Sequence, residues 1–271
     1  MVHFIRGFEK KALSKATLGA GIGLGAGYAS AKKEVEVSNL KEDSLPQSKS
    51  LKDFTKQLIP GDVIYMGGKN RKDDSFQDFG YHIIPRLGGN MNFHSMVYTG
   101  KGKVIDVSRD REDGKTKEIL LSDKITGLRQ KDYTQIAYRP IGLSPEDMQR
   151  AADRARKLIG SKYPTNHGLA LKGIKTLLGI PGKKDDITSE ADDIVCQDSA
   201  IKAYPNIFKK RHLTSAEMQY NKQFTPVAKT GKYDYNREER AVANAVYPLA
   251  KSIRGALRGG VAGGFLDLIH K

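Results

Sequence analysis

The pattern of apolar and polar positions predicts a β-hairpin over residues 93–108. Apolar and β-branched residues flank Gly100-Lys101-Gly102, a glycine-rich step that is typical of a tight turn between antiparallel strands. The turn brings His94 and Asp106, twelve positions apart, onto neighbouring strands. The carboxylate of Asp106 could then hold the ring of His94 while the other ring nitrogen faces a reaction partner.

A helical period follows over residues 144–158. Ser144 can cap this helix, Pro145 suits its first turn, and Asp147 stands where a capping-box acid is expected. Apolar residues recur on one face, at Met148, Ala151, Ala152, Ala155 and Leu158. This stripe indicates a face that packs into the core.

The single cysteine of the chain, Cys196, lies where a short polar turn gives way to another helix, which is predicted to end near Tyr204. The unpaired N–H groups and positive dipole end of a helix start favour a thiolate, so this is where a nucleophile would be placed. A small buried hydrophobic residue is the alternative interpretation. One cysteine also excludes a disulfide within the chain.

Cysteine, histidine and a residue that orients the histidine are the minimum set for acyl transfer through a covalent intermediate. Cys196, His94 and Asp106 supply these three types, whereas His82, His167 and His212 have no comparable context. The spacings typical of zinc sites and of nucleotide-binding loops are absent, and the glycines at 19–23 lie in an apolar tail. The sequence therefore predicts neither a metal nor a cofactor.

A series of short motifs resembles the circularly permuted NlpC-type branch of the papain-like cysteine hydrolases, which includes relatives of lecithin:retinol acyltransferase and YiiX-like proteins. In chain order the matching segments are Pro60-Gly61-Asp62-Val63-Ile64-Tyr65, the His-x-x-x-Tyr strand His94 to Tyr98, Tyr138-Arg139-Pro140, a helix from Leu143 to Leu158, Gly160-Ser161-Lys162-Tyr163, and Cys196. The cysteine comes last, which indicates the permuted branch. The resemblance spans about residues 51–225.

This resemblance implies an α+β fold in which an antiparallel sheet packs against the helix that bears the nucleophile, with helical N- and C-terminal extensions. It implies Cys196 as nucleophile, His94 as base and Asp106 as orienting residue. The Cys196 backbone N–H would supply part of the oxyanion hole, and the second donor stays open between Gln197 and Tyr65. The acyltransferase relatives usually carry a second histidine where this chain has Asp106.

Three regions are predicted. Residues 1–50 form a glycine-rich apolar tail and a polar linker, and the linker, residues 34–52, leads into the first strand of the next region. Residues 51–230 form the hydrolase domain. Residues 231–271 form a helical, glycine-rich extension whose helix covers 237–257. Residues 70–92 are expected to form a loop over the site that shapes substrate choice. The uncharged stretch 16–31 suits a signal peptide cleaved at Ala29-Ser30-Ala31, a membrane-associating helix or a docking tail.

The chain is strongly basic, with a net charge of +15 and an isoelectric point near 9.6. Such a balance favours polyanionic partners, but no motif that reads nucleic acid is present. An amide bond in a bacterial cell-wall peptide is therefore the first substrate hypothesis, and an acylated lipid, hydrolysed or used for acyl transfer, is the second. A third hypothesis is a non-catalytic component that docks into an assembly such as a virion, through the glycine-rich termini. The cell envelope, secretion or a virion is favoured over a purely cytoplasmic location.

Overall fold

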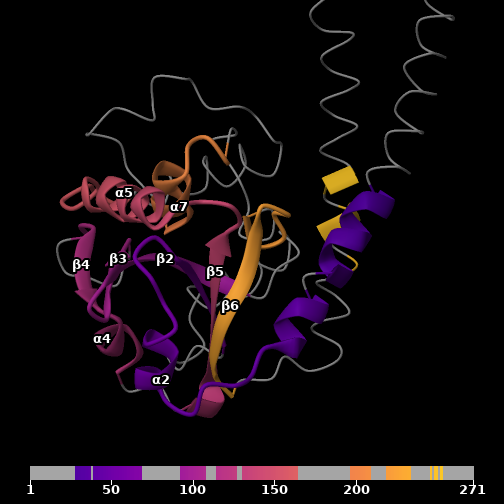
Figure 1. Cartoon of the computed structure of the whole chain (residues 1–271), viewed down its shortest axis with the longest axis horizontal. Coiled ribbons are helices and arrows are strands. Elements are labelled where there is room, and N and C mark those ends of the chain that lie inside the picture. Colours follow the sequence, from indigo (N-terminus) through magenta and orange to yellow (C-terminus); the bar gives the residue numbers. More distant parts are fainter. Residues whose placement is uncertain are drawn as a thin grey trace, which may run out of the picture.

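The computed structural model describes residues 28–37, 39–68, 92–107, 114–126, 130–163, 196–208, 218–232, 245, 247–249 and 251–252. These residues form a mixed α+β structure around a six-stranded antiparallel sheet with strand order β4-β3-β2-β1-β5-β6 (Figure 1). The strands are β1 Val63–Gly68, β2 Asn92–Gly100, β3 Lys103–Asp106, β4 Lys117–Leu120, β5 Tyr133–Pro140 and β6 Phe224–Gly231. The predicted α+β class and antiparallel sheet are confirmed.

Helices cover both faces of this sheet. In Figure 1, α5 (Pro145–Arg156) and α7 (Cys196–Ala203) lie together on the upper side, and α2 (Leu51–Thr55) and α4 (Leu121–Ile125) lie on the lower side. A short 3₁₀ helix, η1 (Gln130–Asp132), leads into β5. The sheet is therefore the middle layer of the described structure.

The central strand β1 shows why both faces need cover, because all six of its residues are buried. Val63 and Tyr65 pack with residues of α5 and α7, whereas Ile64 and Met66 pack with residues of α2 and α4. Successive side chains of a strand point to opposite faces, and a strand covered on both sides has a nearly continuous apolar sequence. The run of apolar residues after Asp62 fits this position.

The predicted hairpin is confirmed. Strands β2 and β3 pair antiparallel, with Val97 opposite Ile105 and Tyr98 opposite Val104. The turn between them places Lys101 in the left-handed region at φ 52°, between two glycines that also have positive φ. Glycine is the residue that adopts such angles without strain, which accounts for the Gly-Lys-Gly sequence.

The predicted helix at 144–158 is also confirmed, as α5. The Ser144 hydroxyl oxygen accepts a hydrogen bond from the Asp147 backbone N–H at 3.1 Å, which satisfies one of the free donors of the first turn. The helix buries the predicted residues Met148, Ala151, Ala152 and Ala155, and Leu158 is buried just beyond its end.

Two of the matched motifs meet at one end of the sheet. The Asp62 carboxylate is fully buried and accepts two hydrogen bonds of 2.8 Å from the Arg139 guanidinium, from Nε and from a terminal nitrogen. The preceding Gly61 has φ 97°, and a Cβ there would lie 2.6 Å from the Met148 carbonyl oxygen. The Gly-Asp and Tyr-Arg-Pro motifs therefore join the start of β1 to the end of β5.

Much of the described part of the predicted linker is helical. Residues 28–37 and 39–44 are helical, and α2 begins at Leu51, within the predicted linker. The backbone N–H of Ser48 donates to the Lys229 carbonyl of β6 at 2.8 Å, so the segment is attached to the sheet edge. Polar composition alone suggested a linker because most of these side chains face solvent.

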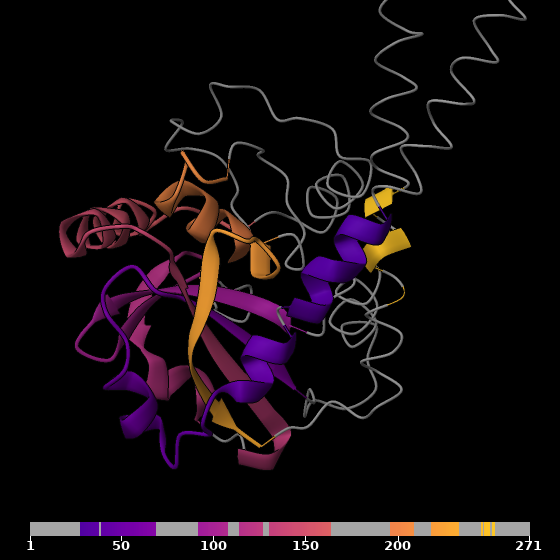
Figure 2. The same ribbon diagram turned by 45° about the vertical axis from the view of Figure 1, so that its right-hand side comes forward.

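The two ends of the described chain pack against one another. Ala31 and Val35 form an apolar cluster with Tyr220 and Tyr247, and the Glu34 carboxylate pairs with the Lys251 ammonium. In Figure 2 the indigo helix near the N-terminus lies beside the yellow helical residues near the C-terminus. We call residues 28–37 together with 247–249 and 251–252 the terminal stem. The described residues between 237 and 257 are helical, as predicted. Within the described ranges, no helix has the length and apolar character needed to cross a membrane.

Several predictions fall outside the described residues. They are the glycine-rich tail as far as residue 27, the loop over the site at 70–91, the histidines His82, His167 and His212, and the C-terminal glycine-rich end. The residue Ala31, at the end of the candidate cleavage site, is fully buried in the terminal stem.

Candidate active site

Three separate elements supply the candidate residues. Cys196 is the first residue of α7, His94 is the third residue of β2, and Asp106 is the last residue of β3. Helix α7 packs directly against β2, which brings the N-terminus of the helix to the strand that carries the histidine. All three side chains are buried.

His94 and Asp106 form a short, buried hydrogen bond. The distance from His94 Nε2 to Asp106 Oδ1 is 2.6 Å. The strand register explains the contact: Val97 pairs with Ile105, so Asp106 lies across from Met96, on the same face as His94. The predicted proximity of these two residues is confirmed.

The His94 ring also reaches the cysteine, because the side chains of His94 and Cys196 are hydrogen-bonded. Since Nε2 is occupied by Asp106, Nδ1 is the ring nitrogen left for the sulfur. The Ser95 backbone N–H donates a second hydrogen bond to Cys196, and Gln197 Oε1 lies 3.2 Å from the sulfur. The structure therefore brings all three predicted residues into one chain of contacts.

Both sequence interpretations of Cys196 describe part of its surroundings. The residue is buried and packs against Val107 and Leu158, as a small hydrophobic residue would. Its sulfur, however, also contacts a histidine, which an ordinary core cysteine does not need. Burial excludes water from the sulfur, while the hydrogen bonds provide partners for a charge on it.

Electrostatics favour an ion pair between the sulfur and the imidazole. Burial raises the pKa of the Cys196 thiol, but the His94 hydrogen bond and charge and the Ser95 N–H outweigh it, so the pKa is lowered despite the nearby Asp198. For His94, burial and the Lys124 charge lower the pKa, yet the hydrogen bonds to Asp106 and Cys196 leave it raised. The two shifts together stabilise thiolate and imidazolium side by side.

The two candidates for the second oxyanion donor both lie near the sulfur. Tyr65 Oη is buried and has no hydrogen-bond partner among the described residues, and burial together with the Cys196 charge raises the pKa of this tyrosine. Gln197 already approaches the sulfur through its side-chain amide. Both residues stay candidates for this donor.

Sequence reasoning missed Lys124, from α4. Its ammonium lies 3.4 Å from each oxygen of Asp106, and only 16% of the side chain is exposed. No motif includes this residue, and only the docking of α4 on the lower side of the sheet brings it to the carboxylate.

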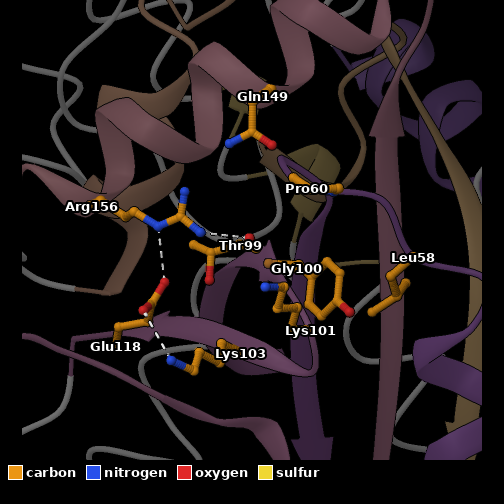
Figure 3. Close-up of a pocket in the computed structure, with 10 residues that line it drawn as sticks. Leu58, Pro60, Thr99, Gly100, Lys101, Lys103, Glu118, Gln149 and Arg156 are labelled. Carbon is orange, nitrogen blue, oxygen red and sulfur yellow. Dashed lines mark hydrogen bonds and ion pairs between the residues drawn. The ribbon is translucent and has the colours of Figure 1, made fainter.

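A pocket of about 580 Å³ lies elsewhere, at the end of β2 remote from His94 (Figure 3). Its lining includes Lys101, Lys103, Glu118 and Arg156 but none of the three candidate residues. Arg156 pairs with Glu118 at 3.0 Å, and Lys103 lies 3.7 Å from the same carboxylate. The single carboxylate of Glu118 thus faces three cations, so the pocket lining keeps a formal charge of +2.

The described residues contain no group of three or more His, Cys, Asp or Glu side chains that could hold a metal ion. A comparison with protein-family models finds no match for this chain, and a comparison with curated proteins finds none either.

Proposed function

We propose that this protein is a papain-like cysteine hydrolase of the circularly permuted NlpC type, which cleaves an amide bond through a thioester on Cys196. The observation that carries this proposal is the buried chain of contacts from the Cys196 sulfur through the His94 ring to Asp106, with 2.6 Å between His94 Nε2 and Asp106 Oδ1. A thiol at a helix start, a raised histidine pKa and an orienting carboxylate together make a nucleophile and its proton carrier.

Each residue has a defined role in the proposed reaction. The Cys196 thiolate attacks the carbonyl carbon, and the Cys196 backbone N–H with one further donor stabilises the oxyanion. His94 gives its proton to the departing amine, which leaves an acyl-thioester on the sulfur. A water molecule then attacks the thioester, His94 takes the proton of that water, and the carboxylic acid product departs with the thiolate restored.

Asp106 determines which nitrogen performs these transfers. Its carboxylate accepts the Nε2 proton of His94, so Nδ1 is the nitrogen that exchanges a proton with sulfur, amine and water. The negative charge of an aspartate in this place also stabilises the imidazolium. A neutral second histidine, as in the acyltransferase relatives, has no such charge.

A peptide of the bacterial cell wall is the proposed substrate, since the wall is anionic and the chain carries a charge of +15. The test is digestion of purified peptidoglycan by the full chain, with product masses read by mass spectrometry. New peptide termini that are absent with Cys196→Ser are the expected result. Release of fatty acid from a phospholipid, with the peptide bonds intact, would replace the peptidase by a lipid acyl hydrolase.

Docking into an assembly is a second candidate function, and the terminal stem favours it. Because residues 28–37 pack against the C-terminal helical residues, the two described segments that adjoin the glycine-rich sequences in the chain lie together. Removing residues 1–27 and 253–271 tests this function. Loss of binding to membranes or particles, with the reactivity of Cys196 unchanged, would support docking by the tails.

A further inference from the structure

The carboxylate of Asp106 has an unusual pair of cationic neighbours. Its side chain is 1% exposed, and a buried carboxylate is unfavourable unless charges and hydrogen bonds compensate for the lost water. His94 lies on one side of it at 2.6 Å, and the Lys124 ammonium lies on another side at 3.4 Å. Both cations contact the same oxygen, Oδ1, so His94 Nε2 and Lys124 Nζ are at most 6.0 Å apart, the sum of these two distances.

Packing holds Lys124 in this place. Helix α4 begins at Leu121, which is fully buried in the lower core and whose backbone N–H donates to the Gly102 carbonyl at 2.8 Å. Lys124 lies one turn later on the same short helix. Lysines are seldom covered to this extent without a partner, and Asp106 is the partner that the contact supplies.

We propose that Lys124 is a positioning residue of the proposed active site, which fixes the Asp106 carboxylate against His94 and sets a counter-charge beside the imidazole. This inference rests on the proposed function. With Lys124 in place, the Asp106 carboxylate is fixed, and its negative charge raises the proton affinity of His94 less than it would alone. The histidine can then accept and release a proton within one catalytic cycle.

The consequence is that the pKa of His94 depends on the charge at residue 124. The Lys124 charge lowers the pKa of His94 against the raising effect of Asp106, so a neutral residue at 124 moves the pKa upward. At the largest possible separation of 6.0 Å and an effective dielectric near 20, the Coulomb interaction corresponds to about two pH units, and solvent at the partly exposed ammonium reduces the expected shift to about one unit.

Other titratable groups of the described residues lie around the contacts between Cys196, His94 and Asp106, and the substitution leaves them unchanged. They are Cys196 and Asp198 on α7, Tyr65 on β1, and Lys117 on β4, which lies opposite Asp106 in the strand register. Lys117 is exposed, so water screens its charge, and it serves as the matched control.

The experiment is an NMR titration of the His94 ring protons in the full chain. The variants are Lys124→Met, Lys124→Arg and Lys117→Met, and the His94 resonance is assigned by its loss in His94→Gln. Lys124→Met should raise the His94 pKa by about one unit, while Lys124→Arg and Lys117→Met should leave it close to the wild-type value. If Lys124→Met does not fold by circular dichroism, Lys124→Gln removes the charge but keeps a donor for Asp106, with the same shift expected.

An unchanged or lowered His94 pKa in the folded, neutral variant would overturn the proposal. So would an equal rise in Lys117→Met, because the effect would then come from general charge. The titration needs no substrate, so it separates two failures. A shift of the His94 pKa without hydrolysis of any substrate would contradict the proposed hydrolase function. Hydrolysis without a shift of the His94 pKa would contradict the role of Lys124.

Discussion

The reactivity of Cys196 should depend on His94 more than on any other side chain. His94→Ala removes both the hydrogen bond and the positive charge that lower the pKa of the thiol. What remains is the Ser95 N–H, which lowers the pKa, against burial and the Asp198 charge, which raise it. The balance then favours the neutral thiol, and the pKa should return to the ordinary value of a free cysteine, about 8.5, or above it.

The size of the effect follows from the ionised fraction. A thiol with a pKa of about 8.5 is only about 3% thiolate at pH 7, whereas a thiolate paired with an imidazolium is largely ionised there. Intrinsic nucleophilicity grows as the pKa rises, with a Brønsted coefficient of about 0.4–0.5, which restores part of the loss. The two opposing effects together leave alkylation at pH 7 only about threefold slower in His94→Ala than in the wild type, so the shift of the pH profile is the readout that decides.

The assay is the rate of iodoacetamide labelling as a function of pH, followed by intact mass. Because Cys196 is the single cysteine of the chain, the label reports this residue alone. His94→Gln, which keeps a hydrogen-bonding side chain without the charge, divides the effect between hydrogen bond and charge. Equal pH profiles in wild type and His94→Ala would refute the ion pair. A wild-type cysteine that is unreactive at every pH would be a structural core residue, and docking would then replace hydrolysis as the proposed function.

Three further predictions concern stability and the terminal stem. Arg139→Met should lower the free energy of unfolding in urea by about 3 kcal/mol, because it leaves Asp62 buried without its partner; a loss within error would contradict the role of this pair. Gly61→Ala should lose at least about 2 kcal/mol, since its Cβ would lie 2.6 Å from a carbonyl oxygen, whereas Gly102→Ala, which meets open space at φ 74°, should lose about 1 kcal/mol. Tyr247→Ala should increase hydrogen exchange over residues 28–37 while Cys196 alkylation is unchanged; slower alkylation would show that stem and site are coupled.

The parts of the fold that the sequence predicts well rest on local signals. The hairpin of β2 and β3 follows from alternation around Gly100-Lys101-Gly102, and α5 follows from the Ser144 cap and a helical apolar stripe. In both, the residues that carry the signal lie within a few positions of one another. The contact of His94 with Asp106 was predictable for the same reason, because a tight turn determines the pairing of its strands.

The polar segment before β1 shows where such signals fail. Residues 34–52 look like a linker by composition, yet 34–37 and 39–44 are helical and Ser48 bonds to β6. Its partners, Lys229 and Tyr247, lie about two hundred residues later in the chain. A helix that buries only a few residues leaves a weak apolar pattern, and most of its stability comes from tertiary packing.

The sequence by itself determined the hairpin, the capped helix, and a cysteine at a helix start, because each depends on backbone geometry and side chains that are close in the chain. Only the tertiary structure decided that α7 packs on β2, so that Cys196 meets a histidine about a hundred residues earlier, and that α4 brings Lys124 to Asp106. The physical reason is that these contacts arise from burying the two faces of one sheet under helices from distant segments. Hydrophobic burial is non-directional, and no local period specifies which helix covers which strand.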